Sequence, residues 1–393
     1  MRAGLLGRKL GHSLSPQIHR FFGDYEYRLY EKEPEEVEGF LRAGFANGDF
    51  DFLNVTIPYK QTVFALCDEL SPMARKLGNV NFVTRTADGK IRGDNTDAFG
   101  VGRLLDANGI DVKGWNCAIL GAGGAAMTVK AVLEERGAKR VTFVRRGEEP
   151  AQDDDFIVNA TPVGMFPDVG GVRVDISRYV ASKAVLDLVY NPSPTRLVRE
   201  ALACGKIAAD GMVMLIAQAY RAFRLSNSNT QTFKHSNTLF LYGPPASGKS
   251  TWAKRIAAAT GWTLVDLDAE IVKQAGRSIP EIFEKEGEKG FREIEKRCLA
   301  TVCGDRNVAA PLGVAVPGGR VVALGGGALL DPESRKIAEA AGRVVVLDCA
   351  IETLKARLTG GDRPLSADAA KLEALVKSRA AHYASFPNHV EMI

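Results

Sequence analysis

The stretch TLFLYGPPASGKS, residues 238–250, is the most informative in this chain of 393 residues. Five uncharged residues end at Tyr242, and the pattern Gly-x4-Gly-Lys-Ser begins at Gly243. A short apolar run before a glycine turn is typical of a buried strand, and residues 251–260 continue as a helix-forming segment. A strand that enters such a loop and leaves it as a helix points several backbone N–H groups at one spot, where they bind phosphate. The stretch therefore predicts a P-loop nucleotide-binding fold.

The polar groups of this loop suit the phosphates of ATP. Backbone N–H groups between Gly243 and Gly248 would cradle the phosphates, Lys249 would neutralise the charge of the β- and γ-phosphates, and Ser250 would hold Mg²⁺. We therefore expect ATP and Mg²⁺ as cofactors in this half of the chain. The residues expected to bind ATP here are Gly243, Ala246, Ser247, Gly248, Lys249, Ser250 and Thr251.

Two carboxylates follow the helix of this motif. Val265-Asp266-Leu267-Asp268 ends a segment that is expected to be a strand, in which side chains two residues apart share a face. Both carboxylates would then point into one site, with Asp266 as a magnesium ligand and Asp268 on the hydroxyl that accepts the phosphoryl group. The alternative is that one of the two caps a helix over residues 269–275.

A second glycine-rich turn lies in the first half of the chain. The apolar strand expected over residues 116–120 runs into Gly121-x-Gly123-x-x-Ala126, and a helix follows. Gly121 permits a tight turn, Gly123 lets the backbone approach a pyrophosphate, and the small Ala126 lets the helix and the strand pack closely. The pattern predicts a dinucleotide-binding site. Its expected ligands are Gly121, Ala122, Gly123, Gly124 and Ala125.

The next strand ends at Val144, and Arg145 and Arg146 follow it. An NAD enzyme places Asp or Glu here for the ribose hydroxyl, whereas arginine suits a 2′-phosphate, so NADP is the expected cofactor. The alternative is a solvated basic end of a strand. Residues 147–155 are too few for the usual crossover helix and its loops, and we expect a short acidic loop there.

Composition limits the classes of partner. The formal net charge is +4, and basic and acidic residues are balanced in both halves, so no nucleic-acid partner is expected. No apolar stretch approaches the ~20 residues that span a bilayer, and no membrane partner is expected. The chain starts with no signal peptide and contains no Cys-x-x-Cys pattern, which favours a cytoplasmic protein with reduced thiols.

A lysine and an aspartate in the first half are candidate catalytic groups. Lys60 ends the stretch NVTIPYK, and Asp97 ends GDNTD. A lysine beside a carboxylate can protonate the oxygen of a ketone while the ketone is reduced. Spacing alone does not reject the alternative that both are surface charges.

Residues 1–225 resemble shikimate dehydrogenase in several motifs that occur in the same order. These are GHSLSPQIH at 11–19, NVTIPYK at 54–60, GDNTD at 93–97, NATPVGM at 159–165, DLVYNP at 187–192 and GMVMLIAQ at 211–218. The resemblance implies that Lys60 and Asp97 are catalytic and that Gly211 lies at the NADP site. Arg145 matches the family, whereas Arg146 rests on spacing alone. The substrate ligands that the resemblance implies are Ser13, Ser15, Thr56, Asn81, Tyr190 and Gln218.

Residues 237–393 resemble shikimate kinase. The matching stretches are VDLD at 265–268, GEKGFREIE at 287–295, GGG at 325–327 and RPL at 363–365. The resemblance implies that Arg363 reaches the transferring phosphate from a lid, that Arg357 lies near the adenine, and that Lys249, Asp268 and Arg363 are catalytic. A pair of arginines suits a carboxylate substrate. The residues implied in shikimate binding are Asp268, Arg292, Gly325, Gly326, Gly327 and Arg379.

Strands that alternate with helices predict an α/β fold throughout. We expect a two-domain dehydrogenase, with an α/β substrate domain and a Rossmann-like NADP domain, followed by a P-loop domain like those of nucleoside-monophosphate kinases. The expected divisions are 1–97 for the substrate domain, 98–210 for the NADP domain, 211–225 for a closing helix, 226–236 for a polar linker and 237–393 for the kinase domain.

The expected function is bifunctional. NADPH would reduce 3-dehydroshikimate to shikimate, and ATP would phosphorylate shikimate to shikimate 3-phosphate. One alternative is a quinate-type dehydrogenase fused to a small-metabolite kinase. Another is a non-catalytic regulator that binds such metabolites, which the presence of Lys60, Asp97, Lys249 and Asp268 argues against.

Overall fold

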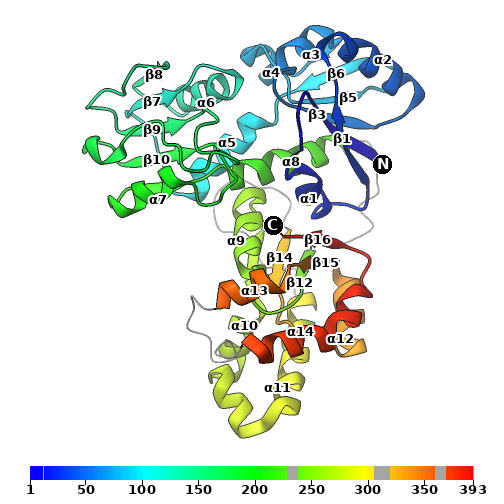
Figure 1. Cartoon of the computed structure of the whole chain (residues 1–393). Coiled ribbons are helices and arrows are strands. Elements are labelled where there is room, and N and C mark those ends of the chain that lie inside the picture. The colour runs from blue at the N-terminus through cyan, green and yellow to red at the C-terminus, as the bar shows by residue number, and fades with distance from the viewer. Residues whose placement is uncertain (12, 228–237, 305–318, 359–368, 393) are drawn as a thin grey trace. The chain divides into compact units, whose positions relative to one another are not determined.

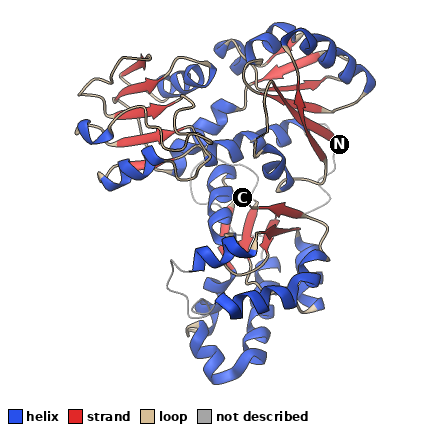
Figure 2. Cartoon of the chain, in the orientation of Figure 1, coloured by secondary structure: helices blue, strands red, loops and turns tan. Residues whose placement is uncertain are grey.

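The computed structural model describes residues 1–11, 13–227, 238–304, 319–358 and 369–392. Its strands form three separate sheets, and the chain divides near residue 230 into two compact units. Helices and strands alternate in both units (Figure 2), which confirms the predicted α/β class. The expected linker lies largely outside the described residues, and so does Arg363.

The first sheet is mixed, with the order β2-β1-β3-β5-β6-β4. β1 pairs in parallel with β2 and β3, and the antiparallel pairs β3–β5 and β5–β6 extend the sheet. The strands are β1 (Arg2–Gly7), β2 (Glu26–Glu31), β3 (Phe52–Val55), β4 (Glu69–Leu70), β5 (Phe82–Arg85) and β6 (Ile91–Asp94). The helices are α1 (Ser15–Arg20), the 3-10 turn η1 (Pro34–Glu36), α2 (Val37–Asn47), α3 (Lys60–Leu66) and α4 (Pro72–Leu77).

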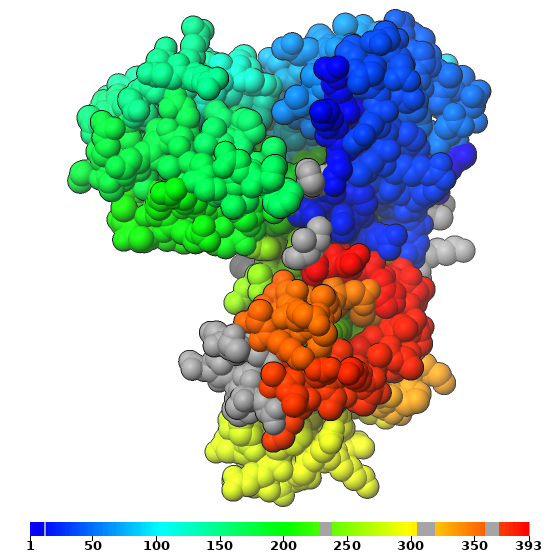
Figure 3. All heavy atoms as spheres, viewed as in Figure 1, coloured from blue at the N-terminus to red at the C-terminus, as the bar shows by residue number. Residues whose placement is uncertain are grey.

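The second sheet is wholly parallel, with the order β11-β10-β9-β7-β8. Its strands are β7 (Asn116–Leu120), β8 (Arg140–Val144), β9 (Phe156–Asn159), β10 (Ala184–Asp187) and β11 (Ile207–Ala209), joined by α6 (Gly124–Glu135), η2 (Ile176–Arg178) and α7 (Arg196–Ala203). The two sheets of the first unit form two masses in the space-filling view, blue for the first sheet and cyan to green for the second (Figure 3).

The crossover from β8 to β9 contains no helix, as residues 147–155 led us to expect. Ion pairs and a hydrogen bond to the neighbouring strand hold it in place instead. Arg140 contacts the carboxylates of Asp153 at 2.7 Å and Asp154 at 3.0 Å, and the backbone N–H of Asn116 donates to Asp155 at 2.9 Å. The segment is therefore a short ordered loop.

Two helices connect the sheets of the first unit. α5 (Asp97–Ala107) follows β6, and α8 (Met212–Ser226) returns from the second sheet to lie beside α5 and α1 (Figure 1). A Cβ on Gly100 would lie only 2.8 Å from the carbonyl oxygen of Met214, so the two helix backbones are in close contact. This return brings residues near 97 and 218 to the same place.

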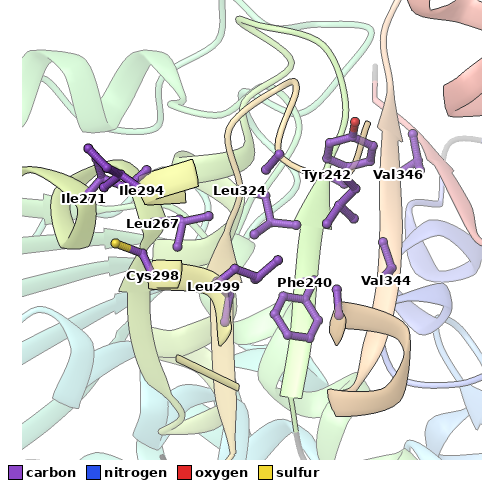
Figure 4. Packing of buried hydrophobic residues seen from close by; sticks show 14 of the residues in the cluster. Phe240, Tyr242, Leu267, Ile271, Ile294, Cys298, Leu299, Leu324, Val344 and Val346 are labelled. Carbon is purple, nitrogen blue, oxygen red and sulfur yellow. The ribbon is translucent and has the colours of Figure 1, made fainter. Parts of the chain in front are cut away.

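The second unit contains a parallel sheet with the order β13-β14-β12-β15-β16. Its core includes Phe240, Leu267, Leu299, Leu324 and Val346, which pack from the sheet and the neighbouring helices (Figure 4). The strands are β12 (Thr238–Tyr242), β13 (Thr263–Asp266), β14 (Arg320–Ala323), β15 (Arg343–Asp348) and β16 (His389–Glu391). The helices are α9 (Lys249–Thr260), α10 (Leu267–Ala275), α11 (Ile279–Gly304), α12 (Pro332–Ala341), α13 (Ile351–Leu358) and α14 (Ala369–Ala384).

No helix in the described part of the chain has the length and apolar character that crossing a bilayer requires.

Candidate active sites

Lys60 and Asp97 form an ion pair in the first unit. Lys60 is the first residue of α3 and Asp97 the first of α5, so two helix starts bring the side chains together. Lys60 Nζ lies 2.5 Å from Asp97 Oδ2, and the two side chains are 17% and 9% exposed. The pair is thus shielded but reachable, which is the setting that proton transfer to a bound ligand needs.

A buried polar network continues from Asp97. Asn81 donates to Asp97 Oδ1 at 2.8 Å through Nδ2, and its Oδ1 accepts the backbone N–H of Thr96 at 2.6 Å. Gln218 of α8 lies 3.4 Å from the Thr96 hydroxyl and 3.5 Å from Asn54 Nδ2. The structure therefore brings together four residues that the sequence analysis singled out as site residues, namely Lys60, Asn81, Asp97 and Gln218.

Sequence reasoning missed further members of this network. Asn54 Oδ1 accepts the hydroxyl of Tyr27 at 3.0 Å, and the ring of Tyr27 stacks on that of His19 with 4.0 Å between centroids. Burial lowers the pKa of His19 to about 3, so its imidazole is neutral. Tyr27 belongs to none of the motifs in the sequence, and it lies on a strand whose residues are mostly exposed.

The other residues expected at the dehydrogenase site lie in loops or next to the ends of helices and strands. Ser13 donates through its hydroxyl to Ser15 at 3.1 Å, and Thr56 directly follows β3. Tyr190 is half-buried, and burial raises the pKa of its hydroxyl. A Cβ on Gly211 would lie 2.2 Å from the carbonyl oxygen of Leu188, so only glycine fits there.

The turn from β7 to α6 has the geometry of a dinucleotide cradle. Gly121 has a φ of +104°, which favours glycine, and Ala126 is fully buried against the sheet. Within the described part of the chain, added Cβ atoms on Gly123 and Gly124 would meet nothing within 4 Å, and no side chain caps α6. Free helical N–H groups beside open space suit a pyrophosphate. Ala122 lies in this turn, and Ala125 is the second residue of α6.

The arginines after β8 are exposed at the carboxyl end of the sheet. Arg145 and Arg146 begin a turn in which Gly147 has a φ of +89°. In a parallel sheet this end of the second strand is where the adenosine ribose of a dinucleotide lies. The side chains are thus free to meet a 2′-phosphate.

The loop after β12 has the conformation of a phosphate cradle. Gly243 and Gly248 have φ values of +129° and +90°, and Ala246 also has a positive φ of 62°. Lys249 folds back over the loop and donates to the carbonyl oxygens of Gly243 and Pro244 at 3.0 and 2.8 Å.

Other groups of this loop also suit phosphate. The hydroxyl of Ser247 is buried and has no hydrogen-bond partner among the described residues. Arg357 of α13 donates to the carbonyl oxygen of Ala246 at 3.4 Å, so its guanidinium lies over the loop. Thr251 follows in the first turn of α9.

Asp266 and Asp268 differ from the expectation of a shared strand face. β13 ends at Asp266, and Asp268 lies in the first turn of α10, so the strand periodicity does not relate the two side chains. Asp266 caps α10, since its Oδ1 accepts the N–H of Asp268 at 3.1 Å, while its Oδ2 lies 3.3 Å from the Ser250 hydroxyl. Asp266 is therefore both a helix cap and a neighbour of Ser250, which fits a magnesium site made of hard oxygen ligands.

The three glycines after β14 are the point on which the charged side chains converge. A Cβ on Gly325 would lie 2.9 Å from Glu295 Oε1 and 3.4 Å from Asp268 Oδ1. A Cβ on Gly327 would lie 2.5 Å from a guanidinium nitrogen of Arg292. Only glycine lets these side chains approach the backbone so closely.

Glu295, which lies next to Gly325, forms an ion pair with Arg292. Arg292 contacts Glu295 at 2.5 Å from one turn along the helix. Burial raises the pKa of Glu295, and the nearby Arg292 charge only partly offsets that effect. The motif begins at Gly287, whose φ of +69° and ψ of −176° break α11 into two helical segments.

Two further side chains approach the glycines from α14. Arg379 and Tyr383 both donate to the carbonyl oxygen of Gly326, at 3.2 and 2.7 Å. A Cβ on Gly326 would lie 3.2 Å from Pro245 of the phosphate-binding loop. Asp268, Arg292 and Arg379 thus surround the same glycines next to the ATP-binding loop. Tyr383 was not recognised from the sequence.

Similarity to known proteins identifies the family of the first unit. Residues 5–83 match the family model of the shikimate dehydrogenase substrate binding domain. Shikimate dehydrogenase (NADP(+)) of Clostridium perfringens (strain SM101 / Type A) is 34% identical over 253 residues, which cover 57% of this chain and 91% of that protein. The chain belongs to the shikimate dehydrogenase family. The enzyme of Methylobacterium radiotolerans is 38% identical, over 56% of this chain and 89% of its own length.

Solved shikimate dehydrogenases share the fold of the first unit. A chorismate mutase/shikimate 5-dehydrogenase fusion protein from Clostridium acetobutylicum matches with a TM-score of 0.55 and 32% identity, over 59% of this chain and 93% of that one. Shikimate 5-dehydrogenase from Thermus thermophilus, in complex with NADP(H) and shikimate, has a TM-score of 0.52 and 32% identity, over 57% and 93% of the two chains.

The second unit matches a different family. Residues 245–392 match the family model of shikimate kinase. The chain therefore joins a shikimate dehydrogenase to a shikimate kinase domain, which confirms the resemblance noted from the sequence.

Proposed function

We propose that this chain catalyses two consecutive steps on one carbon skeleton. The first unit reduces 3-dehydroshikimate to shikimate, and the second phosphorylates shikimate to shikimate 3-phosphate. Membership of the dehydrogenase family and the kinase match support both assignments. The observation that carries the first is the Lys60–Asp97 pair, and the observation that carries the second is the convergence of Asp268, Arg292 and Arg379 on one glycine loop.

In the reductase, Lys60 is the general acid. NADPH, when bound at the β7–α6 turn, supplies the hydride. Lys60 then gives the proton that completes the hydroxyl, and Asp97 holds the ammonium in place. Asn81 and Gln218 present amide groups from the same network to the substrate hydroxyls. Ser13 and Ser15, with Thr56 and Tyr190, are assigned to the remaining polar groups of the substrate.

The kinase site positions ATP and the acceptor hydroxyl and neutralises the charge of the transferring phosphoryl group. ATP supplies the phosphoryl group. Asp268 accepts the proton of the attacking hydroxyl, while Ser250 and Asp266 would hold Mg²⁺. Arg292 and Arg379 bind the carboxylate of the acceptor, because planar guanidinium groups suit a carboxylate. Arg357 is assigned to ATP by its position over the phosphate-binding loop.

A coupled assay tests the proposal. The full chain is supplied with 3-dehydroshikimate, NADPH and ATP, and shikimate 3-phosphate is followed with time. We expect the product only when all three are present. Oxidation of quinate in preference to shikimate would instead indicate a quinate-type dehydrogenase, and binding without turnover of either substrate would contradict the enzymatic assignment.

A further inference from the structure

The end of β8 carries a carboxylate as well as two arginines. Arg145 to Glu148 form a tight turn, in which the N–H of Glu148 donates to the carbonyl oxygen of Arg145 at 3.0 Å. Gly147 occupies the third position of this turn with its positive φ, as type II turns require. The turn returns the chain to the strand end, and Glu148 Oε2 accepts the backbone N–H of Arg145 at 2.7 Å.

A third arginine fixes the turn in this position. Arg173 donates to the carbonyl oxygens of Arg145 and Glu148 at 2.6 and 2.9 Å. The carboxylate of Glu148 is consequently held at the strand end by backbone geometry rather than by a long flexible side chain alone. The next residue behaves differently, because Glu149 accepts the hydroxyl of the buried Tyr179.

These contacts place side chains with opposite charge at the end of the second strand, where the adenosine ribose of a dinucleotide is expected. In dinucleotide-binding folds an acidic side chain at the end of the second strand accepts the ribose 2′-hydroxyl of NAD, whereas arginine accommodates the 2′-phosphate of NADP. This chain places a carboxylate and two arginines there together. A fixed negative charge beside a phosphate opposes its binding, and it can equally accept a hydroxyl.

We propose that Glu148 is a specificity-determining residue that weakens the preference of the reductase for NADP over NAD. This inference rests on the proposed function, since it concerns the cofactor of that same site. Arg145 and Arg146 favour the 2′-phosphate, and Glu148 offsets part of that gain by repelling the phosphate and by offering an acceptor to the free ribose of NAD.

The test measures binding rather than turnover. Dissociation constants of NADP⁺ and NAD⁺ are determined by calorimetry on the full chain and on Glu148→Gln. Glutamine keeps an oxygen that can accept the N–H of Arg145, so the turn is retained. One unit charge about 4 Å from a phosphate in water changes affinity by roughly fivefold. We therefore expect NADP⁺ to bind about 5- to 20-fold more tightly and NAD⁺ to bind equally or more weakly.

Glu149→Gln is the matched control. It removes the same charge from the neighbouring residue, whose carboxylate is directed to Tyr179. The ratio of the two dissociation constants should change by less than about twofold. An unchanged ratio in Glu148→Gln, or an equal rise in both variants, would overturn the inference while leaving the dehydrogenase assignment intact. Failure of the parent chain to bind either dinucleotide would overturn both.

Discussion

Replacing Lys60 by methionine separates the catalytic and the structural parts of the Lys60–Asp97 pair. Methionine fills a similar volume but carries no charge and no proton. The Asp97 carboxylate would then keep its hydrogen bond from Asn81, but its charge would lose the ion pair with Lys60. Reduction of 3-dehydroshikimate should fall about 10²–10⁴-fold, the usual contribution of a positioned general acid.

The stability cost follows from the burial of the pair. Breaking a fully buried ion pair by removing one partner costs about 3–5 kcal/mol. Since Lys60 remains 17% exposed and Asp97 9% exposed, we expect a smaller cost of about 2 kcal/mol. For a unit of this size that corresponds to a fall of about 4–8 °C in the unfolding temperature. Adding Asp97→Asn removes the stranded charge, so stability should recover largely while activity should not.

Calorimetric unfolding and initial reductase rates of the parent, Lys60→Met and the double variant provide the measurement. Phosphorylation of shikimate by the same samples is the internal control and should be unchanged. A double variant that stays as unstable as Lys60→Met would show that the pair does not act through its charge. Near-normal reduction by Lys60→Met would refute the general-acid role.

Three further outcomes follow from the structure. Gly327→Ala should raise the KM for shikimate at least tenfold and leave the KM for ATP unchanged, because the added Cβ displaces Arg292. Gly304→Ala, where a Cβ meets no atom of the described residues within 4 Å, should change neither. Asp266→Asn should keep the helix cap but raise the Mg²⁺ concentration needed for half-maximal kinase rate about tenfold, and an unchanged Mg²⁺ dependence would exclude it as a ligand. The free energy of unfolding of the first unit should fall as the pH drops from about 6.5 toward 3, by at most about 1.4 kcal/mol per pH unit from His19, because the unfolded chain binds a proton there and the folded chain does so only near pH 3. His19→Asn should show a shallower slope over pH 6 to 5, and identical slopes would contradict the buried neutral imidazole.

The strong local patterns were sufficient for much of the fold. β7 and β12 have the bounds that their apolar runs predict, since a strand buried on both faces is a continuous hydrophobic run. Both glycine turns lie between a strand and a helix as expected. Short or half-exposed elements were not predicted, among them β4 with two residues and β2 with its mostly exposed pattern. Such segments are specified by their neighbours and carry little periodicity of their own.

The site residues divide in the same way. The motifs predicted which residues share a site, and the structure shows how their side chains approach one another. Asp268 illustrates the limit, because period-two reasoning assumed a strand through residue 268, whereas Asp266 ends the strand by capping α10. Tyr383 and Tyr27 escaped notice because each acts through a contact with a residue more than 25 positions away, and no local spacing encodes such a contact.

The return of α8 sets the order in which the reductase site can form during synthesis. Thr96 and Gln218 are separated by 122 positions, and at about 5–20 residues per second the second follows the first by roughly 6–24 seconds. During that interval the first sheet is complete in sequence, yet the faces of α1 and α5 that α8 covers have no partner. The nascent chain therefore exposes apolar surface until the ribosome has passed residue 226. A message truncated between residues 209 and 212 would yield chains with the strands of both sheets but no assembled site.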